Sequence, residues 1–239
     1  MGQQINANLY RVKINNGWNS NWSCDKKNYS FLLHDDLFIL KFLRCFLEKR
    51  FGLKIGDFCI QRKFGSVDIW LYVYINFYRN LINYNIKNER FPDNSRYLNH
   101  NISRILSKIT VIEKLLSHLF KCNFKIHLKK SDSPYTSAEY ISTGIKYLIE
   151  KSYKGKKRAL ISFFKCLKNE WKAHKKDIKG IRIRCAGRLD GKSRIAAIYK
   201  HQCGQVPLQT IKAKINYAIS TAFIRYGTIG IKVWVCLNK

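Results

Sequence analysis

The chain has 239 residues, with 45 Lys and Arg against 15 Asp and Glu, so its formal net charge is +30 at pH 7. Such a length can bury a substantial core and favours two domains. The charge far exceeds the small excess that keeps a domain soluble, so a polyanionic partner is expected. Because the basic residues are spread along the sequence rather than gathered in one cationic amphipathic helix, nucleic acid is favoured over a membrane surface.

The sequence also argues against several other classes of protein. Its longest apolar run, residues 69–77, has the length of a strand and is too short to cross a membrane. The eight cysteines form no Cys-x-x-Cys pair, and several lie in apolar runs, which indicates small buried side chains in a reducing compartment. His201 and Cys203 come closest to a metal site, but two ligands are too few, and no cofactor is expected.

The first predicted elements occupy the N-terminal part of the chain. Residues 1–30 are polar and rich in Asn and Trp, which predicts an extended arm. From residue 31 to Gly52, apolar residues recur three and four positions apart, which predicts an amphipathic helix that ends at the glycine. Residues 59–63 and 67–75 are β-rich and are joined by a short turn containing Gly65, as in a hairpin.

A second helix and a third strand complete the predicted N-terminal domain. Residues 79–100 are rich in Asn and contain Pro92, so they are predicted to form a surface insertion. Residues 102–120 repeat at helical spacing, and residues 122–128 alternate like a strand. The order helix, strand, strand, helix, strand defines a domain over residues 31–130.

The second predicted domain covers residues 131–239. Ser133 is expected to cap a helix whose first position is Pro134, and a second amphipathic helix follows over residues 157–171. Gly180 opens an alternating strand over residues 181–185 (IRIRC), and the tail is rich in β-branched and aromatic residues, with Gly227 and Gly230 as expected turns. Helices followed by strands predict an α+β domain with helices on a mostly antiparallel sheet.

The stretch from Gly180 to residue 197 raises the question of nucleotide binding. A phosphate-binding loop of the Walker type places four residues between its first glycine and its Gly-Lys-Ser. Gly187 and Gly191 enclose only three residues, so the loop is one residue short. The stretch is better interpreted as a turn between strands.

Several ordered blocks of the sequence carry a family likeness. They are residues 186–189, 205–211 and 226–234, together with Arg11, Trp18 and Trp22 in the arm. These blocks bracket nearly the whole chain, which closely resembles the universal small-subunit ribosomal protein S-three family.

The resemblance implies a type II KH-like fold for the N-terminal domain. In this fold a Gly-x-x-Gly loop brings the backbone against nucleic acid, just before the helix that contains Ile112. The positions of its two glycines are taken here by Leu106 and Ile109. A degenerate loop of this kind cannot approach a phosphate as glycine does, so the domain is expected to serve mainly as a scaffold.

The resemblance also implies a function and a set of site residues. The protein would be a structural, non-enzymatic component of the small-subunit head that binds small-subunit rRNA, contacts neighbouring head proteins and lines the mRNA entry channel, without membrane insertion. The side chains expected to contact mRNA are Lys154, Lys156, Lys157, Arg158 and Lys165. Those expected to bind rRNA are Arg11, Trp18, Trp22, Arg188, Lys192, Arg194 and Lys200.

Alternatives from other classes remain open at this stage. The main one is a basic RNA-processing enzyme or nuclease, although the carboxylates do not converge: Asp35 and Asp36 lie on a helix whose apolar face dominates. The other alternative is a protein that binds to a membrane surface. The composition, heavy in residues that AT-rich codons supply, and the lack of a targeting signal at the start predict an organelle-encoded protein, mitochondrial rather than plastid.

Overall fold

The computed structural model of the chain divides into two compact units, which are described separately. One unit comprises residues 18–131, the N-terminal unit, and the other combines residues 1–17 with residues 132–239, the C-terminal unit. The break at residues 131 and 132 lies one residue from the boundary expected from the sequence. The residues that the structure describes are 6–14, 17–51, 54–74, 95–130, 134–151, 156–189 and 195–238.

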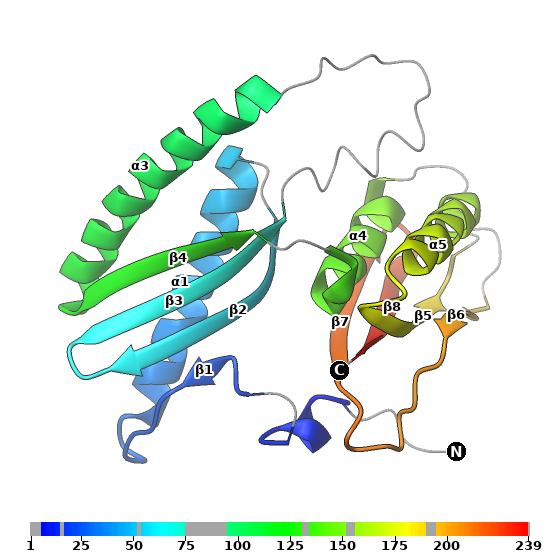
Figure 1. Ribbon diagram of the computed structural model, residues 1–239, viewed down its shortest axis with the longest axis horizontal. Helices are drawn as coiled ribbons and strands as arrows, with labels where there is room; N and C mark the ends of the chain where they lie inside the picture. The colour runs from blue at the N-terminus through cyan, green and yellow to red at the C-terminus, as the bar shows by residue number, and fades with distance from the viewer. Residues whose placement is uncertain are drawn as a thin grey trace. The chain divides into compact units, whose positions relative to one another are not determined.

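The N-terminal unit is a four-stranded mixed sheet with two long helices (Figure 1). Its sheet order is β1-β2-β3-β4, in which β2 and β3 are antiparallel and the outer pairs β1/β2 and β3/β4 are parallel. The described elements are β1 (Ser20–Asn21), α1 (Tyr29–Phe51), β2 (Lys54–Lys63), β3 (Ser66–Tyr74), α3 (Ser95–Phe120) and β4 (Asn123–Lys130).

Local sequence explains how these elements form and pack. Gly65 has a φ of +71°, a conformation that glycine adopts without cost, and it closes the tight turn between β2 and β3. Alternate residues of β3 are buried, from Val67 to Val73, as expected for one core-facing side of a strand. They pack in one apolar cluster with Leu43 of α1 and Leu116 of α3. The parallel pairing of β3 with β4 requires the intervening crossover.

The structure corrects the expected loop in this unit. Helix α3 runs without a break from Ser95 to Phe120, so Leu106 and Ile109 lie on a helix and not in a turn. Ile109 is 5% exposed and belongs to the core, whereas Leu106 is exposed. Residues 95–100 of the expected insertion are also helical, because the helix starts seven residues earlier than its apolar repeat. The rest of that insertion, from residue 79, lies outside the described residues.

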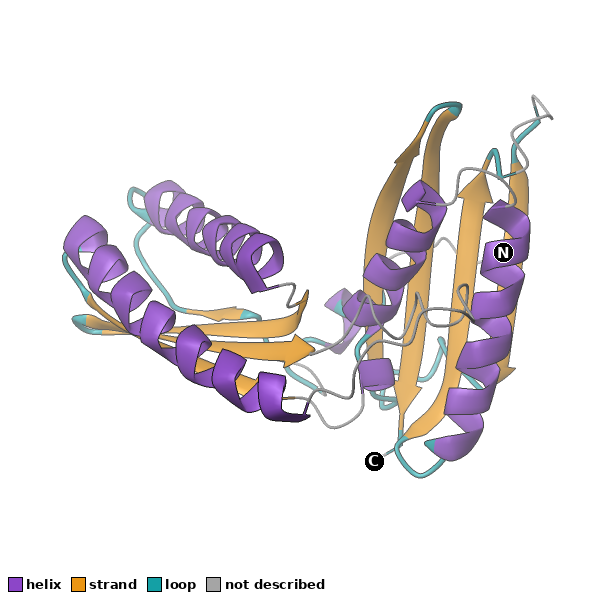
Figure 2. Cartoon of the chain, turned by 90° about the horizontal axis from the view of Figure 1, so that it is seen from above, coloured by secondary structure: helices purple, strands orange, loops and turns teal. Residues whose placement is uncertain are grey.

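The C-terminal unit is an antiparallel sheet covered on one face by helices (Figure 2). The strand order is β6-β5-β8-β7, so the two central strands are the first and last in sequence. The described elements are η1 (Leu9–Arg11), η2 (Pro134–Thr136), α4 (Ala138–Lys151), α5 (Lys156–Ala173), β5 (Ile178–Gly187), β6 (Ala197–Gly204), β7 (Ile215–Ile224) and β8 (Gly227–Leu237). Both units are therefore α+β, which confirms the expected fold class.

Alternation along the strands separates the two faces of this sheet. On β5, Ile181, Ile183 and Cys185 are at most 2% exposed, whereas Arg182 and Arg184 between them are half-buried. The buried set faces the helices, since His201, which pairs with Ile183, stacks on Phe164 of α5 with ring centroids 4.7 Å apart. The opposite set defines what we call the helix-free face.

Two local predictions in the C-terminal unit are corrected, and one element that the sequence left open is assigned. The amide of Tyr140 donates to Oγ of Ser137, so Ser137 caps α4, and Pro134 opens the preceding 3-10 turn instead. Gly230 lies inside β8 rather than at a turn, since it pairs with Ala186 and Thr221. The segment after the short glycine loop, open between helix and strand in the sequence, is the strand β6.

The predicted N-terminal arm is shared between the two units. Residues 6–14 include η1 and join the C-terminal unit, where Ala7 packs with Ile215, Trp234 and Cys236. Residues 20 and 21 add strand β1 to the other sheet, where Ser20 pairs with Ile60. The polar composition of the arm predicts neither contact, because each depends on single residues, such as Ala7 and Ser20, rather than on a periodic pattern.

Candidate nucleic-acid interface

Arg11 is a structural residue in this fold rather than a surface cation. Its side chain is only 2% exposed, and the guanidinium donates to four backbone carbonyls at 2.8–3.0 Å. Burial lowers the pKa of Arg11, and the nearby Cys236 raises it by a smaller amount. All of these carbonyls belong to the C-terminal unit: Ala7, Leu208, Thr210 and Ala213. The structure thus gives Arg11 a structural role in place of the predicted rRNA contact, because it is buried and four of its five N–H donors are used within the fold.

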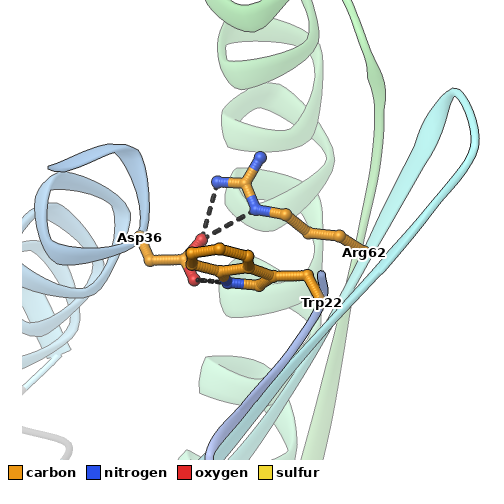
Figure 3. A network of polar contacts seen from close by, with 3 residues as sticks. All are labelled: Trp22, Asp36 and Arg62. Carbon is orange, nitrogen blue, oxygen red and sulfur yellow. Dashed lines mark hydrogen bonds and ion pairs between the residues drawn. The ribbon is translucent and has the colours of Figure 1, made fainter. Parts of the chain in front are cut away.

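Trp22 is part of a buried polar network in the N-terminal unit (Figure 3). Its indole Nε1 donates to Oδ2 of Asp36 at 2.7 Å. Arg62 of β2 donates to the other carboxylate oxygen, from Nη2 at 2.6 Å and from Nε at 2.9 Å. Asp36 is only 3% exposed. Its hydrogen bonds connect the arm, α1 and β2.

Sequence reasoning missed this network because its members are far apart along the chain. In the sequence, Asp36 is one polar residue on an amphipathic helix, and its partner Arg62 lies 26 residues further on, in a strand. The half-buried Trp22 retains a ring contact with Tyr29 at 5.4 Å. Trp18, by contrast, is 56% exposed, and its rRNA contact stays a prediction.

Three of the residues expected to contact mRNA lie at the start of α5. Lys156, Lys157 and Arg158 occupy its first three positions, and Lys165 is exposed further along the helix. Lys154 lies outside the described residues. Lys156, Lys157 and Arg158 thus lie at the positive end of the helix dipole, and the first turn of α5 contains no acidic residue. Such an arrangement favours a bound anion.

The remaining predicted rRNA contacts lie on or beside the sheet of the C-terminal unit. Arg188, just after β5, is half-buried, and its guanidinium lies 5.7 Å from the ring of Tyr226. Lys200 is exposed on β6. Lys192 and Arg194 fall in the loop outside the described residues.

The helix-free face carries a basic row that the sequence analysis did not assemble. Arg184 of β5 pairs directly with Lys200 of β6 on one side and with Lys232 of β8 on the other. Cross-strand partners point to the same face, so the three cations stand side by side on neighbouring strands. In the next row, Arg182 lies 5.7 Å above the ring of Trp234. Alternation in IRIRC predicted two arginines on one side of a strand, but only the pairing adds the two lysines.

The cysteines and histidines of the chain form no metal cluster among the described residues. His201 and Cys203 are in contact, with Nε2 and Sγ 3.2 Å apart, and burial together with Lys168 lowers the pKa of His201. Cys185, Cys203 and Cys236 are buried as predicted, and burial raises the pKa of Cys185 to about 12. Cys24 and Cys45 are exposed, contrary to expectation, and Cys45 lies on the side of α1 opposite the buried Leu43 and Leu47.

The helices seen in the described part of the chain lack the combination of length and apolar character needed to span a membrane.

Comparisons with known proteins agree with this picture of a basic two-unit α+β protein. A family model described as "Ribosomal protein S3, C-terminal domain" matches residues 158–235. Small ribosomal subunit protein uS3 of Borreliella burgdorferi is 32% identical over 240 residues, covering 98% of this chain and 70% of that protein. The corresponding protein of Borrelia duttonii is 30% identical, covering 98% and 74%, and that of Pelotomaculum thermopropionicum is 28% identical, covering 98% and 87%.

These similarities define a class and a family. The class is that of basic ribosomal proteins built from two α+β units. The chain belongs to the uS3 family of small ribosomal subunit proteins, which confirms the resemblance drawn from the sequence blocks.

Proposed function

We propose that the chain is a structural component of the small ribosomal subunit, where it binds small-subunit rRNA and contacts neighbouring proteins of the head. The observation that carries the proposal is the similarity to uS3 proteins along 98% of the chain, which includes both units. The formal net charge of +30 supports it, because rRNA is the polyanion that such an excess of cations would neutralise.

The mechanism is electrostatic and positional. Lys and Arg side chains contact phosphates without reading bases, and each contact releases counterions from the RNA. A fixed scaffold makes these contacts specific in space, since two sheets hold the cations at defined spacings. No covalent step is needed for this role.

A finer part of the proposal concerns mRNA. Lys156, Lys157, Arg158 and Lys165 of α5, with Lys154 just before it, would line the mRNA entry channel and hold the incoming strand. A row of cations at the start of a helix attracts phosphates that slide past, because no base contact fixes the register. The N-terminal unit would then act mainly as a scaffold, since a continuous helix replaces the turn that would approach RNA.

The cellular site is proposed as the mitochondrial ribosome. The residues that AT-rich codons supply, chiefly Asn, Ile, Lys, Phe and Tyr, support an organelle-encoded chain, and a plastid is the second possibility. An RNA-processing enzyme, the main alternative, receives no support from the relatives, which are all named as ribosomal proteins.

A sedimentation experiment tests the proposal. Lysates of purified mitochondria are separated on sucrose gradients, and the full-length chain is followed by antibody. We expect it in the small-subunit fraction, released to the top of the gradient by ribonuclease. A chain that stays at the top without ribonuclease, or that floats with membranes, would contradict the assignment.

A further inference from the structure

We infer that the helix-free face of the C-terminal sheet is an RNA-backbone docking surface, with Arg184, Lys200 and Lys232 as its central phosphate contacts. This inference rests on the proposed function and adds the location of the contact. Of the three residues, only Lys200 stands out in the sequence, and the face as a unit exists only after the strands are paired.

The strand pairing places three like charges next to one another, which favours a negatively charged partner. The two strands that flank β5 bring Lys200 and Lys232 to positions about 10 Å apart with Arg184 between them. Like charges directly opposite each other on neighbouring strands are destabilising. A chain with cationic partners on both sides of Arg184 therefore stores repulsion that a bound polyanion would relieve.

The protein supplies no carboxylate on this face among the described residues. Residues 178–189 and 195–238, which form all four strands and their described connections, contain no Asp or Glu. The described acidic side chains of this unit are elsewhere: Glu139 and Glu150 on α4 and Glu170 on α5 belong to the helix layer, and Asp177 precedes β5. The described residues of the four strands thus contribute only positive charge to this face.

The composition of the face fits RNA better than an acidic protein. Cores of protein interfaces are depleted in charged residues and in lysine especially, whereas here two lysines and an arginine occupy three neighbouring strands. RNA backbone recognition uses spaced Lys and Arg without such a core. Beside the row, the contact of Arg182 with Trp234 holds a fourth cation on the same face.

One end of the face is closed, which limits where RNA can lie. Trp234 and Cys236 are covered by Ala7 and by the half-buried residues Val206, Leu208 and Ala213. Beyond this cover, Lys200 is exposed, and Ile198 and Ile219 are 53% and 61% exposed. The accessible part of the face is therefore the part that carries the basic row.

The test compares three triple variants of the full chain by filter binding to bacterial small-subunit rRNA, with KCl raised from about 50 to about 300 mM. The first variant, R184Q/K200Q/K232Q, removes the row. The second, R184K/K200R/K232R, keeps its charge. The matched control, K168Q/K172Q/K176Q, removes three exposed lysines of α5 and the turn after it. Circular dichroism checks that each variant is folded.

The expected result is a change in salt dependence. Removing the row should flatten the slope of log K against log salt by about 2 to 3, at 0.7–0.9 per contact, whereas the charge-keeping variant and the control keep the wild-type slope. A wild-type slope for the first variant would overturn the inference. If R184Q/K200Q/K232Q keeps the wild-type slope but no longer retains a neighbouring protein in reconstituted subunits, the inference is overturned and the face docks a protein instead. If the wild-type chain itself does not bind rRNA, the proposed function fails.

Discussion

At the scale of single residues, two of the charged side chains that the structure describes are buried, and both hold distant segments together. Arg11 joins the segment around Ala7 to the segment around Leu208, and Asp36 joins Trp22 and α1 to β2 of the other unit. Neither side chain is exposed at the surface. Position in the fold, rather than residue type, therefore decides which of the many basic residues are available for binding.

Replacing Arg11 should destabilise the C-terminal unit. R11M removes the guanidinium donors of four backbone carbonyls, of which that of Thr210 keeps another donor, the amide of Ala213, so we expect the free energy of unfolding to fall by about 3 kcal/mol. R11K should lose less, since an ammonium offers three donors but cannot reproduce the planar fork. Urea unfolding measures both, and K212M on the exposed Lys212 is the control, expected to stay within about 0.5 kcal/mol of wild type. Equal stability of R11M and K212M would contradict the structural role.

Asp36 allows a sharper comparison because its neighbour carries the same side chain. D36N leaves the half-buried guanidinium of Arg62 without a carboxylate and should cost about 3 kcal/mol. D35N, one residue away, makes no contact of this kind and should cost less than about 0.5 kcal/mol. The double variant D36L/R62M should recover part of the loss, because it removes both charges together. Urea unfolding that shows equal effects for D36N and D35N would refute this interpretation of Figure 3.

At the scale of elements, the edge where β5 meets β6 depends on two paired glycines. Gly204 has a φ of +69°, and an added Cβ would collide with the carbonyl oxygen of Lys179. A Cβ on its partner Gly180 would lie 2.5 Å from the carbonyl oxygen of Gln205. The backbones approach too closely here for a larger residue, which explains why Gly180 of β5 and Gly204 of β6 are paired at this end of the two strands.

We therefore expect G204A to weaken the C-terminal unit. The substitution adds both a collision with backbone and an unfavourable φ, so the free energy of unfolding should fall by more than about 2 kcal/mol. Gly17 has open space around its Cβ position, so G17A is the matched control and should change stability by no more than about 0.5 kcal/mol. Thermal unfolding of the two variants gives the comparison, and similar melting temperatures would show that the strands can separate without cost.

Helix α5 leads to a prediction in which stability and binding change in opposite directions. The variant K156Q/K157Q/R158Q removes three cations from the positive end of the helix dipole, which should stabilise the helix by about 0.3–1 kcal/mol per residue. It should also flatten the salt slope for a single-stranded uridine oligomer by about 2, at roughly 0.7 per contact.

The control for α5 is again K168Q/K172Q/K176Q. Because Lys172 lies in the last turn, where a cation is favourable, this control should lose a little stability and keep the salt slope. Melting temperature and filter binding of the same samples measure both quantities. An unchanged slope in K156Q/K157Q/R158Q would remove this cluster from the proposed mRNA path.

At the scale of the whole molecule, positive charge is present in both units. The C-terminal unit has 25 Lys and Arg against 6 Asp and Glu, and the N-terminal unit has 20 against 9. Self-repulsion of this size opposes the compact state when no polyanion is bound. The free protein is thus expected to be less stable than its packed cores alone would make it.

Salt should therefore stabilise the isolated chain. Raising KCl from about 10 to about 100 mM shortens the Debye length from about 30 Å to about 10 Å and screens this repulsion. We expect the melting temperature to rise by several degrees, measured by circular dichroism. Proteins held by surface ion pairs show the opposite sign, so a melting temperature that falls with salt would contradict the dominance of repulsion.

Much of the fold follows from sequence pattern because helices and strands depend on local periodicity. The three-and-four spacing from residue 31 predicted α1, and alternation in residues 181–185 predicted β5. Prediction failed where local signals were weak or misleading. Helix α3 extends through Leu106 and Ile109, where the family pattern places a turn, because neither residue interrupts a helix as glycine would.

The sequence by itself determined the basic character, the α+β class, the family and the clustering of cations at the start of α5, since these depend on composition or on neighbours along the chain. Tertiary structure alone decided that Arg11 is buried, that Asp36 holds Arg62 and Trp22, and that Arg184 stands between Lys200 and Lys232. The reason is physical: burial and cross-strand pairing depend on residues that are tens to hundreds of positions apart, and local patterns carry no record of which distant segments meet.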